Sequence, residues 1–483
     1  MRYLHFILRN RLNQKYLFIA VAAIITQFIV FKALYPFGDY FTDSYSYINA
    51  AANHHAVSYR PLGYSKFLSL VHAVTVSETA LLLIQYLLLQ LAALHFFFTL
   101  LYFYQPGRRT RMGLFAVLLF NPVTLYLCNF VSSDALFAAL SLYWLLQLLW
   151  TLRRPRLYQL LLQAVLLYFL LEIRFAALYY PLVGIMALLL CRANWWYKLT
   201  GSALLVAVSV FCIVSVQRAT QSVTGTRVFS AFSGWQWANN SLHMYCYVQH
   251  DTSGLPASCV VLDSFVKAWF DTACPRMRQQ AYGISTDYMW NPGMPLKQYM
   301  EYHRQQKKLR DYFDAWNAVG PVYAEYGRFL VKKHPAAYAR YYLWPGAKEY
   351  LLPGLELMQS YNQGIDTVDD VAKNWFRYRD NHVACISPGL QEKLLSPFPV
   401  IFMLCNTLFA AGLLGFLRAK GFHRAGPLFS RSLLLAAFFW LVNAGFSTAA
   451  TPSSTRYEAF PMLVLACFCL LTFGWLWRER QRV

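Results

Sequence analysis

The stretch TALLLIQYLLLQLAALHFFFTLLYFYQPGRRTRMGLFAVLLFNPVTLYLCNF, residues 79–130, decides the fold class of this chain. It contains two apolar runs without a charged residue, 79–104 and 112–130, and each approaches the roughly 20 residues that a membrane-spanning helix needs. The connection between the two runs is short and holds three arginines. The stretch therefore predicts two spanning helices joined by a basic turn in water.

Similar apolar runs recur along the whole chain. They lie near 16–34, 135–150, 157–171, 175–191, 199–217, 397–417, 432–450 and 459–477, which brings the expected total to about ten spans. The two short runs between 157 and 191 are expected to be separate spans, because a single helix would break the alternation of basic connections. With 58% hydrophobic and only 13% charged residues, the chain is neither a soluble enzyme nor disordered. The expected fold is mainly α, a polytopic membrane helical bundle.

The net charge of +21 reports orientation in the membrane rather than nucleic-acid binding. Basic residues gather in alternate connections, and the positive-inside rule places these connections and both termini in the cytoplasm. They are Arg2, Arg9, Arg11, Lys15, Arg108, Arg109, Arg111, Arg153, Arg154, Arg156, Arg192, Lys198, Arg418, Lys420, Arg424, Arg431, Arg478, Arg480 and Arg482. Short inner loops and outward cysteines fit a bacterial inner (plasma) membrane.

The chain is expected to divide into three parts. They are an N-terminal membrane module of about seven spans at 1–217 with its first outward loop at 35–78, an outward or periplasmic soluble domain at 218–396, and a C-terminal module of about three spans at 397–483. The soluble domain is expected to be mixed or mainly helical. Apolar positions from 296 to 334 recur at helical spacing, which predicts a helix pair broken near Gly320-Pro321.

Four of the ten cysteines, Cys246, Cys259, Cys274 and Cys385, fall in the outward domain. An oxidising compartment allows disulfides there, and one or two bridges are expected, with the pairing open. No CxxC or HExxH motif occurs in the sequence. No metal site or cofactor is therefore expected, although the use of a divalent cation is left open.

The first outward loop is the richest stretch for chemistry. Asp39 and Asp43 lie just beyond the first span, and the loop returns through Tyr59, Arg60 and Tyr64 into an apolar segment too short to span. Such a segment is expected to lie in the membrane interface. A carboxylate there is placed to take a proton from a hydroxyl. The alternative is that both carboxylates are simply solvated.

Several motifs, taken in order, resemble the GT-C superfamily of membrane glycosyltransferases. They are DSYSYINAA from Asp43, RPLGYSKFL from Arg60, NPVTLY from Asn121, SSDALFAALSLYWLL from Ser132, and RYEAFPMLVL from Arg456. The likeness includes the protein O-mannosyltransferase and aminoarabinose-transferase branches and covers the membrane half of the chain.

The resemblance implies transfer of a sugar from a polyprenyl-phosphate donor to an acceptor hydroxyl on the outer face of the membrane. The acidic residue that acts as catalytic base in the first loop of the family matches Asp43 best, with Asp39 in reserve. The mannosyltransferase branch has an adjacent Asp-Glu pair, whereas Ser44 follows Asp43 here. That difference puts the acceptor class of that branch in doubt.

Three arginines are the candidates for binding the donor phosphate. Arg60, Arg174 and Arg456 are among only five basic residues in the outward, membrane-proximal parts of the chain. Arginine offers paired donors to phosphate, and a lipid-linked phosphate lies at the membrane interface. As alternatives, Arg174 pairs with Glu172 across one turn, and Arg456 anchors the last span.

Further substrate-binding candidates lie close to these residues. They are Tyr64, Asp134, Glu172, Tyr457, His54 and His55. For Asp134 the alternative is a helix cap, since it follows two serines at a helix start. For the two histidines the alternative is a solvated loop. The aromatic residues of 235–247 and 288–299 either stack on sugar rings or form interfacial belts and small cores.

Other classes of membrane protein remain alternatives. A polysaccharide polymerase or ligase of another membrane fold would place its key basic residues in a large outward loop. A secondary transporter would show related halves and interrupted spans, which this sequence lacks.

The expected partners are the lipid bilayer, a polyprenyl-phosphate-linked sugar and an unknown acceptor, which is a glycan, a lipid or a protein. The sugar stays open as well.

Overall fold

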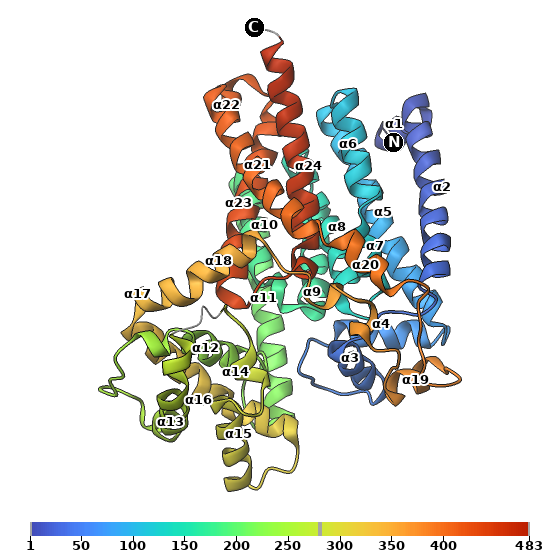
Figure 1. The fold of residues 1–483 in the computed structure, drawn as a ribbon. Coiled ribbons are helices and arrows are strands. Elements are labelled where there is room, and N and C mark those ends of the chain that lie inside the picture. Colours follow the sequence, from blue (N-terminus) through green and yellow to red (C-terminus); the bar gives the residue numbers. More distant parts are fainter. Residues whose placement is uncertain (1, 279–282, 482–483) are drawn as a thin grey trace.

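The computed structural model describes residues 2–278 and 283–481, and this part of the chain is almost entirely helical (Figure 1). Extended pairing within the described part is limited to isolated bridges, such as the one between Asp39 and Phe130. The prediction of a mainly α membrane protein is confirmed.

Eight helices of the described part are long and apolar enough to cross a membrane. They are α2 (Arg11–Leu34), α5 (Glu78–Tyr104), α6 with α7 (Arg108–Leu119 and Pro122–Asn129), α8 (Ser133–Arg153), α11 (Trp195–Thr224), α20 with α21 (Pro388–Leu395 and Phe398–Arg418), α23 (Pro427–Ala450) and α24 (Thr455–Arg480). Two shorter apolar helices, α9 (Leu157–Ile173) and α10 (Tyr180–Leu190), are separated by an extended residue and the turn η1 (Phe175–Tyr179). Whether these two also span the membrane stays a prediction.

The helices at the centre of the bundle differ from those at its edge. About two thirds of the apolar window of α5, α8 and α24 is buried within the protein, against 17% for α2 and α11. Apolar side chains that neither pack on protein nor face water need lipid around them. The apolar faces of α2 and α11 are therefore the surfaces that the bilayer would cover.

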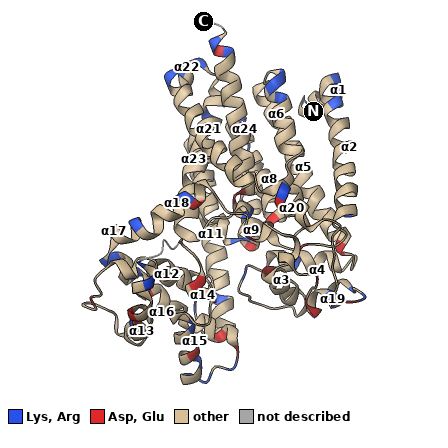
Figure 2. Cartoon of the chain, viewed as in Figure 1, with Lys and Arg blue, Asp and Glu red and all other residues tan. Residues whose placement is uncertain are grey.

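Charges distribute unevenly along the bundle. Both termini lie at one end, together with basic residues of α1 (Arg2–Arg9), α6, α22 (Gly421–Arg424) and α24 (Figure 2). Five helices form a separate body at the opposite end (Figure 1): α12 (Ser233–Leu242), α13 (Val260–Met277), α14 (Asp287–Trp290), α15 (Pro295–Gln306) and α16 (Tyr312–Lys333). This is the arrangement that the alternating basic connections require, while the membrane side of each end stays a prediction. The predicted domain boundary at 217 lies inside α11, which continues to Thr224.

This body, called the outward body after its predicted side of the membrane, is built on the close packing of α12 (Ser233–Leu242) against α16 (Tyr312–Lys333). A Cβ added at Gly234 would lie 2.0 Å from the carbonyl oxygen of Gly320, so no larger residue fits. The predicted helix break at Gly320-Pro321 is wrong, because α16 runs through Pro321. The proline removes one backbone hydrogen bond, and the packing on α12 at this turn holds the helix together.

The break between the two predicted helices lies earlier, between α15 (Pro295–Gln306) and α16. Lys308 has a left-handed backbone with φ of 54°, which ends the first helix. The Asp311 side chain then accepts a hydrogen bond from the backbone N–H of Phe313 at 2.6 Å and caps α16.

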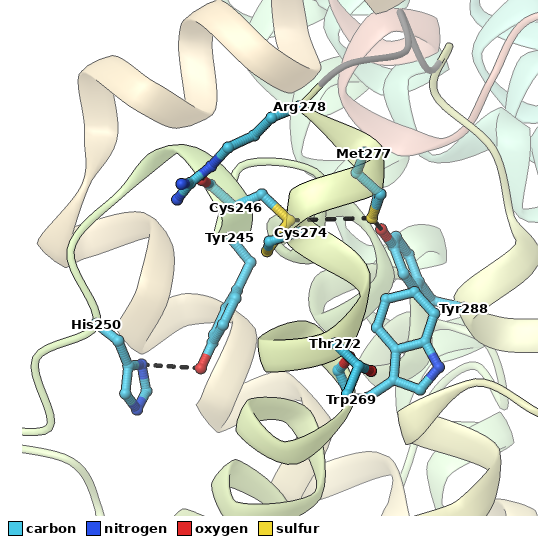
Figure 3. The surroundings of a disulfide bond; sticks show 9 residues. All are labelled: Tyr245, Cys246, His250, Trp269, Thr272, Cys274, Met277, Arg278 and Tyr288. Atoms are coloured by element: carbon cyan, nitrogen blue, oxygen red, sulfur yellow. Dashed lines mark hydrogen bonds between the residues drawn. A yellow bond between two sulfur atoms is a disulfide. The ribbon is translucent and has the colours of Figure 1, made fainter.

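One disulfide joins Cys246 to Cys274 near the end of α13 (Val260–Met277; Figure 3). Arg278 donates to the backbone carbonyl of Cys246 at 2.7 Å beside it. Cys259 and Cys385 are free thiols. The expectation of one or two bridges in this domain is met by one.

The first outward loop folds into α3 (Thr42–Ala52) and α4 (Gly63–His72), both too short to span a membrane. Gly63 lies where α4 packs on the end of α9. A Cβ added at Gly63 would lie 2.4 Å from the backbone carbonyl oxygen of Glu172, and backbone cannot move aside as a flexible side chain can. Glycine at this position lets α4 contact the end of α9.

Replacing Gly63 with alanine is expected to lower the free energy of unfolding by about 1–3 kcal/mol, because the added methyl overpacks a backbone contact. Thermal unfolding of the purified protein in one detergent measures the effect as a lower Tm. Gly107→Ala is the matched control, since a Cβ at Gly107 meets nothing within 4 Å. Equal Tm values for the two variants would contradict the close contact.

Thiol labelling checks the disulfide and its compartment together. After denaturation without reductant, peptide mapping is expected to find Cys246 and Cys274 unlabelled and the eight other cysteines labelled. Reduction before labelling should expose both thiols, because it breaks the bond between them. The bridge is expected in the cell because this domain is predicted to face an oxidising compartment. Labelling of both cysteines without reductant would show that the bridge does not form in the cell.

Candidate functional site

A cavity of about 370 Å³, here called the first cavity, opens where the bundle meets the outward body. Its walls come from α3, the start of α8, η1 with α10, the chain segment 229–236, the end of α23 and the start of α24. Segments from both membrane modules and from the outward body therefore share one cavity.

A cluster of charged side chains lines this cavity. Arg456 lies between two carboxylates, with Nη1 at 3.8 Å from Oδ2 of Asp43 and 3.5 Å from Oδ2 of Asp134. Arg60 forms an ion pair with Asp43, and Arg174 forms one with Asp134. The three arginines proposed for the donor phosphate and the proposed base, which are far apart in the sequence, thus lie together.

Burial separates the cluster into two layers. The side chains of Asp134 and Arg456 are 2% and 5% exposed, whereas those of Asp43, Arg60 and Arg174 are each about a fifth exposed. A buried charge needs a partner, and Asp134 and Arg456 supply this to each other. They form the floor of the site, and the other three charges face the cavity.

Some donors in this region have no acceptor. Nε of Arg60, Nε of Arg456 and the hydroxyl of Ser453 are buried, and the described residues offer none of them a hydrogen bond. Native structures leave few buried polar atoms unpaired. The guanidinium groups of Arg60, Arg174 and Arg456 line the cavity, and phosphate oxygens match guanidinium geometry.

Helix starts place two of the charges. Asp134 is the second residue of α8, and the cap itself is Ser132, whose hydroxyl accepts from the Asp134 N–H and donates to its carboxylate at 2.6 Å. The alternative that Asp134 caps the helix is therefore wrong. Its carboxylate pairs with arginines and also faces the positive end of α8. Arg456 is likewise the second residue of α24.

Tyr457 joins the cluster, whereas Glu172 lies outside it. The Tyr457 hydroxyl accepts from Arg456 Nη2 at 2.6 Å, and the Arg174 guanidinium lies 4.8 Å from its ring centre. The alternative pairing of Glu172 with Arg174 is wrong, because Glu172 accepts from Lys66 at 2.6 Å instead. Neighbouring side chains at the end of α9 thus point to different partners.

The reserve base Asp39 is buried away from the first cavity. Its carboxylate accepts from the backbone N–H of Asn362 at 2.9 Å, and burial raises the pKa of Asp39 well above its usual value. Its backbone also bonds to Asn129 and Val131. The contacts of Asp39 hold the loop in place and leave Asp43 as the carboxylate at the cavity.

The remaining candidates do not line the first cavity. Tyr64 is fully buried and donates to the side-chain oxygen of Gln85 at 2.6 Å. His54 is exposed in the loop with φ of 49°, and His55 lines a neighbouring cavity considered below. Their predicted roles in substrate binding stay predictions.

A carboxylate that sequence reasoning did not select also lines the first cavity. Glu458 is buried and accepts from Asn443 Nδ2 and Ser447 Oγ, both at 2.9 Å. The sequence held a signal for Glu458, because this residue belongs to the same RYE motif as Arg456 and an ionisable residue within an apolar span is a functional candidate.

Among the residues that the structure describes, no cluster of His, Cys, Asp or Glu has the arrangement of a metal site.

Comparisons with profiles of known protein families, with curated proteins and with solved structures give no match. The likeness to GT-C glycosyltransferases therefore rests on the order of the sequence motifs alone.

Removing the buried carboxylate tests the cluster. Asp134→Asn is expected to lower the free energy of unfolding by about 3 kcal/mol, because it leaves buried guanidinium charge without its partner. Glu172→Gln should cost less than about 1 kcal/mol, since its partner Lys66 is 63% exposed. Thermal unfolding in detergent compares the two variants. Equal losses would contradict the buried ion pairs.

Proposed function

We propose that the protein is an integral-membrane glycosyltransferase, which moves a sugar from a polyprenyl-phosphate donor to an acceptor hydroxyl on the outer face of a cell membrane. The observation that carries the proposal is that Asp43 lines one cavity with three arginines, two of which, Arg60 and Arg456, lie within ion-pair distance of it. The motif order shared with GT-C enzymes adds support. We further propose that both termini are cytoplasmic in a bacterial inner membrane and that residues 218–396 are periplasmic.

The proposed step is a displacement at the anomeric carbon of the sugar. The acceptor oxygen forms the new bond to this carbon as the bond to the phosphate oxygen breaks. The phosphate leaves with the bonding electron pair, and Asp43 receives the hydroxyl proton. This reaction needs a proton-accepting carboxylate near the acceptor hydroxyl and cations near the leaving phosphate.

The arginines match the second requirement. Arg60 and Arg174 face the cavity, and Arg456 lies beneath them with an unpaired N–H. Fixed cations lower the barrier when negative charge develops on a leaving group in a site sheltered from water. Asp134 holds two of these arginines in place and is a positioning residue in this scheme.

Sugar transfer in proteoliposomes tests the proposal. Wild-type protein supplied with extracted polyprenyl-phosphate sugars and an envelope extract as acceptor should form a glycosylated product. Asp43→Asn is expected to lower the initial rate by about 100-fold or more, because it removes the proton acceptor.

Asp271→Asn is the matched control, since Asp271 lies on the surface of α13 and pairs only with Lys267 among the described residues. It should transfer at the wild-type rate. Full transfer by Asp43→Asn would exclude Asp43 as the base. No transfer by wild type, with a donor pool that a known transferase uses, would reject the proposed reaction.

A further inference from the structure

A larger cavity of about 930 Å³, here called the second cavity, lies next to the first. Tyr59, Arg60 and Phe232 line both cavities. Arg60 is also the residue that pairs with Asp43. Anything bound in the second cavity would therefore lie one side chain away from the proposed base.

Aromatic rings form one wall of the second cavity. Trp290 at the end of α14 (Asp287–Trp290) and Tyr312 at the start of α16 are 46% and 45% exposed. Behind them Trp316 is stacked on Trp235, with ring centres 4.0 Å apart. Large, half-exposed rings held by a rigid stack are available to a ligand without rearrangement.

A buried lysine lies within this wall. Lys297 is 8% exposed, and its ammonium lies 4.3 Å from the ring centre of Trp316 and 5.0 Å from that of Tyr312. It donates to the Tyr312 hydroxyl at 2.5 Å, and the described residues give it no carboxylate partner. Burial lowers the pKa of Lys297 to about 8. An ammonium has three donors, so two remain for a ligand.

Hydrogen-bond acceptors also line the second cavity. Asp311, Asp314 and Asp369 line the second cavity, together with the amide of Asn49. These groups accept hydrogen bonds from hydroxyls, and the ring faces pack against C–H groups. A sugar ring carries both hydroxyls and C–H faces. The carboxylates and the Lys297 ammonium can bind its hydroxyls, and the aromatic rings can pack against its C–H faces.

We propose that the second cavity binds the acceptor and that the acceptor is a glycan, an inference that rests on the proposed glycosyl transfer. The glycan would pack on Trp290 and Tyr312, with hydroxyls bonded to Lys297 and the aspartates. Its terminal hydroxyl would reach Asp43 past Tyr59 and Arg60. A volume near the upper end of the roughly 300–1,000 Å³ of small-molecule sites has room for more than one sugar ring.

Other acceptor classes fit the second cavity less well. A lipid phosphate would meet three carboxylates there against two cations, Arg60 and Lys297. One recurring way to bind an extended peptide is to add it to the edge of a sheet, and the described chain offers only isolated bridges. The lining therefore favours an uncharged, hydroxyl-rich acceptor.

Glycan binding without donor tests this proposal. Full-length protein in nanodiscs is applied to an array that holds bacterial surface oligosaccharides and Ser/Thr-containing peptides, and the best oligosaccharide is then titrated in solution. Wild type should bind oligosaccharides and not peptides. Trp290→Ala is expected to weaken binding by about tenfold, because it removes a ring face at the cavity mouth. Asp314→Asn is a second variant with a smaller structural change.

Trp344→Ala is the matched control, since Trp344 is 62% exposed on α18 (Trp344–Leu351) and lies outside the second cavity. It should bind as wild type does. Binding of peptides instead, no oligosaccharide binding by wild type, or unchanged affinity in both cavity variants would overturn the proposal. Oligosaccharide binding that both cavity variants weaken, in a protein that transfers no sugar, would uphold the site and reject the transferase reaction.

Discussion

The guanidinium of Arg456 is the group around which the rest of the site is arranged. It is buried at the start of the last helix, and its nearest carboxylates come from α3 and α8. A charge at this depth is stable only when it is paired. The three segments must therefore meet at one point, and this requirement fixes the first outward loop against the end of the bundle.

Hydrogen bonds, instead of ion pairs, hold the same loop from the other side. The Glu78 side chain accepts from the backbone N–H of Gly38 and from the Tyr40 hydroxyl, and Asp39 is bonded to Asn362. Gly63 brings α4 against the end of α9. Asp43 and Arg60 thus project from a loop that is held at both ends, which is the preorganisation that a binding or catalytic site needs.

The sequence was sufficient for the parts of the structure that depend on composition. Apolar runs located the long helices, and the scarcity of charge on the outward side singled out Arg60, Arg174 and Arg456. The ion pairs of these residues were not predictable, because they depend on how the helices pack and not on distance along the sequence. Glu172 is two residues from Arg174 in the sequence and nevertheless pairs with Lys66. Pro321 likewise stays within α16, because packing on α12 overrides a local signal that usually ends a helix.

The order of synthesis gives the buried cluster a further consequence. Arg456 follows Asp134 by 322 residues, so the ribosome, which adds roughly 5–20 residues per second, delivers the cation tens of seconds after the carboxylate. Until the last helix inserts, the growing chain holds Asp43 and Asp134 without one of their shared partners. Insertion of that helix completes the bundle and adds a third arginine to the cluster, whose two carboxylates are already paired with Arg60 and Arg174. A chain that stalls before this point lacks the one cation that joins the two carboxylates, and this distinguishes its site from that of the finished protein.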